Sequence, residues 1–458
     1  MGGLNTTLLV ATQGLSAAEA ALDSASNNIS NANTPGYTRE QVQLSENPEY
    51  LNGDTVTGGG VTVNGVASVR AQLLNLQIQQ LTSLQSSVNT QSSNLQSIQD
   101  LFSSTGGDIG SMLNAFSSSL AALSANPANS SVQDSVVTAG QNLAQSFNST
   151  ASGLEGAQTA ADQQVTQTVA QINSLTSQIA QLNSQLTPTV MSQQNGGTIE
   201  DQRDQLVQQL SGLVGISITQ SSDGEVITTA NGSPLVMGNQ SFALQTTTGS
   251  DGFQQVLDAN GNNITASIQG GQLGGAIQTR DQIIPGFLDS LNALATQFAD
   301  SVNGAQAKGT DSTGATGQPF FSIPSSGSAA AGLSVALTSG SQVAISSDGS
   351  TGSNGNITNL LAAVNGNMSS GQTPADAYAD IVYDVGSAAS NATAQSTALG
   401  DNITQLTNQQ SSVSGVNLDE ETTNLIRYQT AYEAAARVVS TIQLLNTVTL
   451  EMGTSQSY

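Results

Sequence analysis

Apolar residues recur at helical spacing at the beginning of the chain and again at its end. Between Leu4 and Ile29, and between Leu425 and Leu445, successive small or apolar positions lie three or four residues apart. A period near 3.5 residues is typical of a coiled-coil seam, along which one helix packs against another. We therefore expect two terminal helices that assemble through these seams. The predicted seam positions are Leu4, Leu8, Ala11, Leu15, Ala18, Leu22, Ala25 and Ile29 at the start and Leu425, Tyr428, Tyr432, Ala435, Val439, Ile442 and Leu445 at the end.

Helical periodicity also dominates the middle of the chain, with two interruptions. Over 215–275 and 307–354 the apolar spacing changes towards two, between clusters of Gly, Asn, Asp and Ser that favour turns. In the first interruption, the stretch 221–224 predicts a hairpin turn, and further strands are expected at 235–237, 242–245, 253–257 and 264–268. The helical patterns cover 66–102, 109–123, 132–147, 160–186, 199–214, 270–305, 357–364 and 375–406.

The order of these patterns predicts a mainly α fold with a β insertion, because helices from both halves of the chain must share one bundle. We expect an elongated, discontinuous rod with terminal coiled-coil helices, a bundle of long helices and an outer antiparallel β domain. The expected domains are a terminal coiled-coil domain of 1–33 and 417–458, a helical bundle of 34–214, 276–306 and 355–416, and an outer β-rich domain of 215–275 and 307–354.

Composition argues against several functional classes. The chain has 32 acidic and 7 basic residues, a net charge of -25, and neither cysteine nor histidine. It therefore lacks the basic stripe that nucleic acids or an anionic membrane surface require, and it lacks the usual zinc ligands and the commonest general base. No apolar run reaches the roughly 18 residues that span a bilayer, and no Lys or Arg precedes the first apolar residues, so we expect no cleavable signal. We expect no cofactor, no nucleic acid and no membrane partner.

One candidate for chemistry is a group of acids on a predicted helix. Glu200, Asp201 and Asp204 lie beside Arg203, whereas a glycosidase needs two carboxyl groups that face each other across a cleft. We interpret the group as an exposed first turn, where acids interact favourably with the helix dipole. It predicts no catalytic residue.

A second candidate is the stretch 258–264, which has acidic or amide side chains at the first three ligand positions of a calcium loop. The glycine and the glutamate that such a loop needs later are replaced by Asn263 and Gln269. A β-turn at Asn260-Gly261 explains the stretch better. We therefore predict neither a metal site nor an enzyme.

Several stretches resemble a known protein family. Residues 26–39, Ser-Asn-Asn-Ile-Ser-Asn-Ala-Asn-Thr-Pro-Gly-Tyr-Thr-Arg, resemble the N-terminal motif of bacterial flagellar axial proteins, which include rod, hook and hook-associated proteins. Residues 201–207, 232–238 and 271–281 resemble the hook-associated protein 1 family in particular, and 414–437 resembles its C-terminal helix. The family's turn motif corresponds to Asn33, Thr34, Pro35, Gly36 and Tyr37.

The resemblance implies a structural adaptor that joins the flagellar hook to the filament. It implies terminal helices that line an axial channel, with a helical domain outside them and a β domain outermost. The implied partners are the hook protein, the second hook–filament junction protein, further copies of the chain in a ring, and a cytoplasmic export chaperone at the C-terminal segment. Type III export would place the protein outside the cell, in the flagellum. The alternatives are another axial protein, such as the hook subunit or the second junction protein, or, from other classes, a surface adhesin or a hydrolase.

Overall fold

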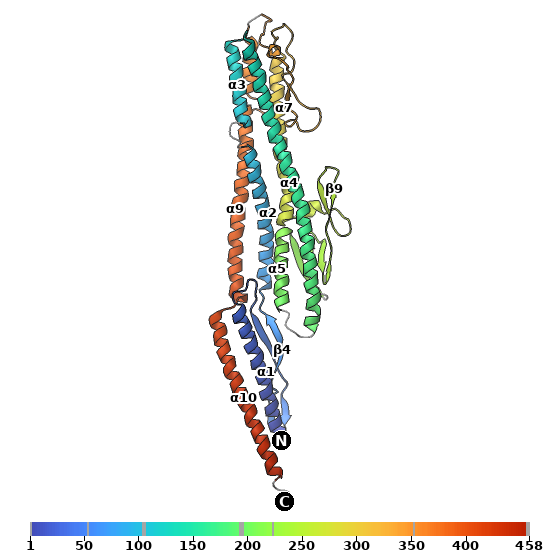
Figure 1. Ribbon diagram of the computed structural model, residues 1–458, viewed down its shortest axis with the longest axis vertical. Helices are drawn as coiled ribbons and strands as arrows, with labels where there is room; N and C mark the ends of the chain where they lie inside the picture. The colour runs from blue at the N-terminus through green and yellow to red at the C-terminus, as the bar shows by residue number, and fades with distance from the viewer. Residues whose placement is uncertain are drawn as a thin grey trace.

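The structure is a computed structural model that describes residues 2–52, 55–102, 107–191, 197–221, 224–350 and 353–454. Mainly helical elements form a long rod that has both chain ends at one end (Figure 1). The helices are α1 (Gly2–Asn31), α2 (Gln72–Phe102), α3 (Ile109–Ala125), α4 (Ser130–Met191), α5 (Gly197–Leu213), α6 (Gly271–Gln278), α7 (Ile284–Gln306), α8 (Gly355–Asn365), α9 (Pro374–Ser414) and α10 (Leu418–Thr454). The elongated, mainly α fold that the periodicity predicts is therefore confirmed.

The two ends of the chain form one terminal unit, consisting of α1, α10 and a β-hairpin. Helix α1 packs along α10, and the antiparallel strands β1 (Glu40–Glu46) and β4 (Val61–Ser68) lie against α1. Between them, β2 (Tyr50–Asn52) pairs with β3 (Thr55–Thr57). Helix α1 ends before Pro35, because proline disfavours a helical conformation at the residue that precedes it. Gly36 then turns the chain with a φ of 78°.

The rod beyond the terminal unit is built on α2 and α9, which run antiparallel, with α4 and α5 beside them (Figure 1). Helix α4 is one continuous helix of 62 residues, whereas the sequence predicted two helices, 132–147 and 160–186. That prediction is wrong, because Ala151, Leu154 and Ala161 keep a buried stripe at helical spacing through the supposed break. The helix also continues past the end predicted at Thr187-Pro188, to Met191.

Two strand-containing segments are attached to the rod. The first contains the antiparallel sheet β5-β6-β7-β8, the hairpin of β9 and β10, and a 3₁₀ turn. The second contains one short pair, β11 with β12. Their strands are β5 (Ile216–Ser221), β6 (Gly224–Thr229), β7 (Pro234–Met237), β8 (Gln240–Ser241), β9 (Gln245–Thr248), β10 (Gln254–Leu257), β11 (Phe321–Ser322) and β12 (Ser334–Val335).

The strand predictions for the first segment are partly correct. Strands β5 and β6 pair as expected, although residues 222–223 of the predicted hairpin turn lie outside the described residues. The predicted strand at 264–268 is wrong, because Thr265–Ser267 form a 3₁₀ turn. The side chain of Asn263 accepts hydrogen bonds from both the amide and the hydroxyl of Thr265, at 3.0 and 2.7 Å, and so holds the turn. Of the strand predicted at 242–245, residues 242–244 lie between β8 and β9, and only Gln245 belongs to a strand, as the first residue of β9.

The two strand-containing segments belong to different hydrophobic cores, although the sequence grouped them as one outer domain. Phe320, Leu333 and Val343 pack into a core at the tip of the rod with α3, α7 and α8, whereas Ile227 and Val256 pack into a core with α4, α5 and α6. The connecting helix α7 has 23 residues, which corresponds to about 34 Å. That length carries the chain from the side domain, residues 215–275, to the tip (Figure 1).

Candidate assembly site

Helices α1 and α10, which carry the predicted seams, pack along each other within a single chain. Ala18, Ala25 and Ile442 are buried, and most other predicted positions are half-buried. Two seam residues of α10 remain exposed, Tyr432 at 37% and Leu445 at 47%. The buried alanines of α1 allow close approach by its neighbours. Half-buried members of the seams are Leu4, Leu8, Ala11, Leu15, Leu22, Ile29, Leu425, Tyr428, Ala435 and Val439.

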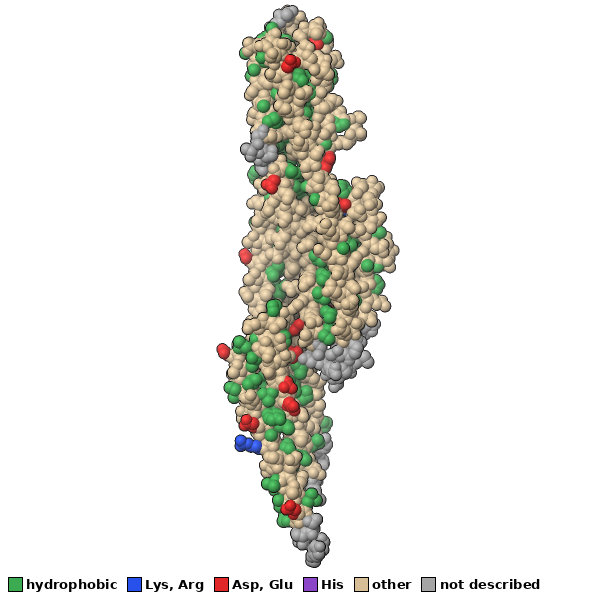
Figure 2. All heavy atoms as spheres, in the orientation of Figure 1, with side chains coloured by type: hydrophobic (Ala, Val, Ile, Leu, Met, Phe, Trp, Pro, Cys, Tyr) green, Lys and Arg blue, Asp and Glu red, His purple; other side chains and the backbone are tan. Residues whose placement is uncertain are grey.

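A second apolar stripe on α10 remains uncovered in the single chain. Its positions step by three and four residues, as in the first seam, so the spacing was visible in the sequence. Figure 2 shows apolar side chains gathered over the terminal part of the molecule. The apolar members of the stripe are Ala431, Ala434, Val438, Leu445, Val448 and Met452, with Thr441 among them, and all seven are exposed. A helix that is apolar on two faces has one face for its own chain and one for a neighbour.

The turn motif is held from inside the terminal unit by a buried asparagine. The Asn28 side-chain oxygen accepts from the Tyr37 hydroxyl at 2.9 Å and from the Glu40 amide at 2.8 Å, while its Nδ2 donates to the Glu40 carbonyl at 2.9 Å. Burial, together with the charges of Glu40, Asp201 and Glu421, raises the pKa of Tyr37, so its hydroxyl stays protonated and continues to donate. Asn33, Thr34, Pro35 and Gly36 lie exposed at the surface of the turn.

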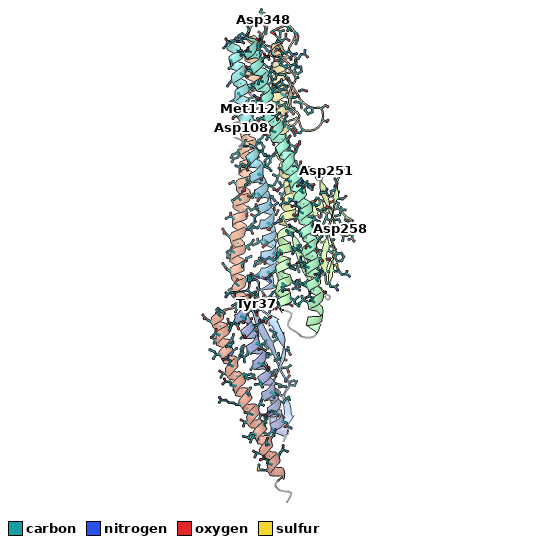
Figure 3. All side chains as sticks on the ribbon, viewed as in Figure 1. Tyr37, Asp108, Met112, Asp251, Asp258 and Asp348 are labelled. Carbon is teal, nitrogen blue, oxygen red and sulfur yellow. The ribbon has the colours of Figure 1, made fainter. Side chains whose placement is uncertain are left out.

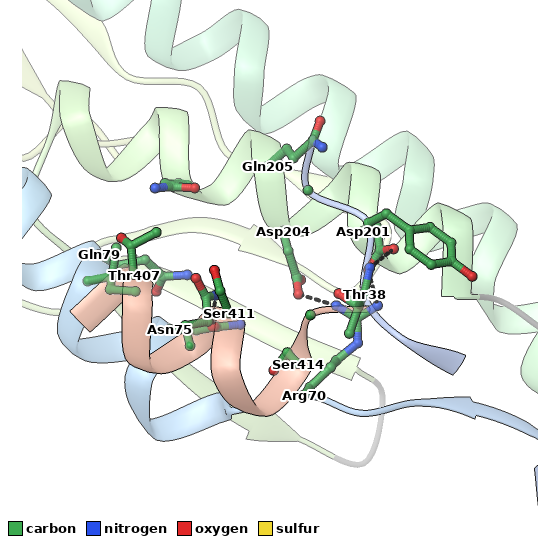
Figure 4. Close-up of a pocket in the computed structure, with 16 residues that line it drawn as sticks. Thr38, Arg70, Asn75, Gln79, Asp201, Asp204, Gln205, Thr407, Ser411 and Ser414 are labelled. Atoms are coloured by element: carbon green, nitrogen blue, oxygen red, sulfur yellow. Dashed lines mark hydrogen bonds and ion pairs between the residues drawn. The ribbon is translucent and has the colours of Figure 1, made fainter. Parts of the chain in front are cut away.

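The same turn contacts the rod at the acidic first turns of α5 (Figure 4). The Thr38 amide donates to Asp201 Oδ2 at 3.0 Å, and Gln205 Nε2 donates to the Pro35 carbonyl at 2.8 Å. The two sides enclose a polar cavity of about 300 Å³ that Tyr37 and Arg70 help to line. We call this region the joint; it comprises the turn motif, Thr38, Arg70 and the acidic residues of α5.

Arg70, in the connection between β4 and α2, pairs with the acids of the joint. Its guanidinium pairs with Glu200 at 3.1 Å and Asp201 at 2.7 Å, and also with Asp204. Burial alone would lower the pKa of Arg70, but the three carboxylates outweigh it and raise that pKa. For Asp201, burial raises the pKa against the opposing effects of the Thr38 amide and Arg70.

The interpretation of these acids as an exposed helix turn is therefore wrong for Asp201, whose exposure is 7%. Residues 200–204 are more than 125 positions from Arg70, and no local pattern links them. The sequence did contain one indirect signal, the small number of basic residues. A chain with only 7 basic residues uses several of them as internal partners for acids; besides Arg70, Arg203 pairs with Glu225 of β6 at 3.1 Å.

The second candidate from the sequence is a turn. Asp258 accepts from the amides of Asn260 and Asn262 at 2.9 and 2.8 Å and from the Asn262 side chain at 3.0 Å, which confirms the predicted β-turn. Figure 3 places Asp258 on the side domain and Asp348 at the tip, both far from Tyr37 at the joint. Within the described part of the chain, no three residues of the His, Cys, Asp and Glu types are grouped so that they could hold a metal ion. None of the described helices is both long and apolar enough to cross a bilayer.

Comparison with known proteins places this architecture in a functional class. Residues 8–38 match the flagella basal body rod protein family, and residues 408–447 match the C-terminal family of flagellar basal body rod FlgEFG proteins. Residues 95–321 match the helical domain of flagellar hook-associated protein FlgK. Paired terminal helices carrying a discontinuous helical rod therefore define a flagellar axial protein.

Relatives that cover nearly the whole chain identify the family. Flagellar hook-associated protein 1 of Bacillus subtilis is 30% identical over 94% of this chain and 95% of its own length. The protein of the same name from Salmonella typhimurium is 28% identical over 95% and 97%, and that of Escherichia coli is 26% identical over 94% and 96%. The chain belongs to the flagellar hook-associated protein 1 family, and the resemblance predicted from its motifs is confirmed.

A solved structure agrees with the fold. The flagellar hook junction protein FlgK from Burkholderia pseudomallei superimposes with a TM-score of 0.66 at 20% identity, over 74% of this chain and 100% of that one. The protein is thus a structural component of the bacterial flagellum, with a part in flagellum assembly and motility.

Proposed function

We propose that this chain is the adaptor subunit that joins the flagellar hook to the filament, and that its terminal helices carry the assembly. The observation that supports this most directly is the second apolar stripe on α10, because such a continuous exposed stripe is costly to leave in water. Family membership supports a role in the flagellar axis. The packing of α1 on α10 leaves the second stripe exposed as the surface through which subunits would assemble.

In this proposal the seam between α1 and α10 and the second apolar stripe on α10 have separate roles. The predicted seam residues of α1 and α10 hold the terminal unit together, with Ala25 and Ile442 at its buried centre. Tyr432 and Leu445, which stay exposed at the edge of the seam, contact neighbouring subunits together with Val438 and Met452. The helices of adjacent copies then pack side by side around the axis as a ring.

The proposed partners follow from the same role. They are the hook protein on one side, the second hook–filament junction protein on the other, and further copies of this chain. Before assembly the exposed stripe of α10 needs protection, so a cytoplasmic chaperone at the C-terminal segment and export by the flagellar type III apparatus belong to the proposal. The finished location is the extracellular flagellum, at the junction between hook and filament.

The test is complementation of a strain that lacks this protein, with electron microscopy of its flagella. We expect the deletion to leave intact hooks without filaments, and the parent chain to restore filaments. Val438→Asp should fail to restore them, because assembly would bury a charge against apolar partners. Ser440→Asp places the same charge away from the stripe and serves as the matched control. A deletion strain that has no hooks would reject the adaptor role, and normal motility with Val438→Asp would reject the proposed surface.

A further inference from the structure

Two short connections carry the chain between the terminal unit and the rod. Residues 69–71 lead from β4 to α2, and residues 415–417 lead from α9 to α10; neither stretch is helical or part of a strand. They lie at the same level, because the Arg39 amide donates to the Ser414 carbonyl at 2.9 Å and the Val69 amide donates to the Arg39 carbonyl at 2.8 Å. Two non-helical connections side by side are the geometry of a hinge.

The packing at this level does not by itself prevent bending. Among the described elements, α1 and α10 pack extensively on each other, and α1 also packs on β1 and β4. The long contacts of α2 and α9 are likewise made within the rod. Hydrogen bonds at the joint therefore decide whether the two bodies keep a fixed angle.

One buried carboxylate connects the two sides of the joint. Asp201 lies on α5 of the rod; its Oδ1 accepts from Nη2 of Arg70, in the connection 69–71, at 2.7 Å, and its Oδ2 accepts from the Thr38 amide of the terminal unit at 3.0 Å. Arg70 is itself oriented by Glu200 and Asp204, so the Asp201 carboxylate has a defined direction. Charge-assisted hydrogen bonds of this kind are stronger than neutral ones and are geometrically specific.

The turn motif is shaped to reach this carboxylate closely. Gly36 has a φ of 78°, and a Cβ atom there would lie 1.9 Å from Gln205 Nε2. Any other side chain at position 36 would be strained at this φ and would displace the Gln205 amide, so glycine preserves the hydrogen bond from Gln205 Nε2 to the Pro35 carbonyl, at 2.8 Å. The turn motif and the stretch 201–207, far apart in sequence, meet at one place.

We propose that Asp201, supported by Gln205, locks this hinge and holds the terminal helices at one angle to the rod. Asp201 is a positioning residue. Arg70 orients its carboxylate, and the carboxylate fixes the turn motif of the terminal unit. The lock belongs to the isolated chain and does not depend on its proposed place between hook and filament.

Distance measurements between two spin labels test the lock. Because the chain has no cysteine, Gln80→Cys on α2 and Gln429→Cys on α10 place two labels at exposed positions near the joint. Pulsed electron paramagnetic resonance on the full chain should give one narrow distance distribution. Asp201→Ala and Gln205→Ala should each broaden and shift it, and the double variant should lose the narrow peak.

Gln202→Ala is the matched control, because Gln202 lies next to Asp201 on α5 but is exposed and makes none of the hydrogen bonds described at the joint. Its distribution should stay narrow. Circular dichroism checks that each variant keeps its helices, and exposed Gln205 provides a test even if Asp201→Ala fails to fold. A narrow, unshifted distribution in Gln205→Ala and in a folded Asp201→Ala would overturn the proposal. Equal broadening in Gln202→Ala would also overturn it, by assigning the change to a general loosening of α5.

Discussion

Arg280 should hold the side domain against the rod, and its removal should loosen that domain selectively. It lies in a π-helical turn between α6 and α7 and is 2% exposed. Its Nη1 pairs with Asp162 of α4 at 2.6 Å and donates to the Gln254 carbonyl of β10 at 2.7 Å. Its Nε and Nη2 bind Asp281 at 2.6 and 2.9 Å. A single guanidinium thus joins the rod helix, the side domain and the π-helical turn.

The cost of Arg280→Met can be worked out from what each partner would lose. Removing one member of a buried ion pair costs about 3–5 kcal/mol, because the other charge stays buried without compensation. The Asp281 side chain is 36% exposed and would be rehydrated, whereas Asp162 is 13% exposed and would keep one hydrogen bond, from the Gln254 amide at 2.7 Å. Methionine also fills much of the vacated space. We therefore expect the lower end of the range, about 3 kcal/mol.

Amide hydrogen exchange is the appropriate assay, because a chain with separate cores does not unfold in a single two-state step. A loss of about 3 kcal/mol corresponds to opening that is roughly a hundredfold more frequent. We expect this faster amide exchange in β10 and α6, with little change in the exchange of α3 at the tip. Arg280→Met combined with Asp162→Leu should recover most of the loss, since replacing both charges removes the uncompensated one. Unchanged exchange in β10 of the single variant, or no recovery in the double variant, would refute this account.

Two further predictions concern a helix cap and the paired helices. Burial of the Asp108 side chain, the N-cap of α3, acts to raise its pKa, but hydrogen bonds from Ser111 and from the backbone amide of Gly110 together outweigh burial and lower that pKa below its ordinary value. This stabilisation is therefore present above the ordinary pKa and is lost as pH falls through the folded-state pKa. Asp108→Ala should cost about 1 kcal/mol at neutral pH and little in acid. Urea titrations at several pH values measure this, and Asp108→Ser should keep the cap without its pH dependence. Ile442→Asp should separate α10 from α1 in the isolated chain, whereas Tyr432→Asp should leave that pairing intact and block filament attachment. Proteolysis of the terminal helices, compared with motility, distinguishes the two, and equal protease sensitivity would contradict the seam geometry.

Helical spacing predicted most of the fold, because each long helix buries a continuous stripe that the local sequence records. The prediction failed where small residues such as Ala151 hid that stripe in the middle of α4. It also failed for short strands and turns in the side domain, where a single side-chain contact such as that of Asn263 with Thr265 decides the conformation. Apolar periodicity cannot predict the conformation of segments of only three or four residues, because they are too short to show a repeat.

The site was only partly predictable. The seam positions could be read from a period near 3.5 residues, although the same period on another face of α10 was overlooked. The joint could not be read, because Thr38, Arg70 and Asp201 are brought together by tertiary packing alone and share no local pattern. The only sign of such contacts in the sequence is indirect: an arginine occurs in a chain that has few arginines.

The use of arginines inside the molecule has a consequence for how copies approach one another. Arg70, Arg203 and Arg280 are engaged internally, and the exposed basic residues are Lys308 near the tip and Arg427 and Arg437 on α10. The flank of the rod between joint and tip therefore presents exposed acids without exposed cations, including Asp100, Asp289 and Asp401. Neighbouring rods repel along their flanks at distances up to the Debye length, about 8 Å at physiological ionic strength. The terminal units repel as well, because residues 1–68 and 415–458 carry eleven acidic and three basic residues. Apolar contacts between copies must therefore form against a like-charge repulsion, and rising salt should ease assembly by screening it.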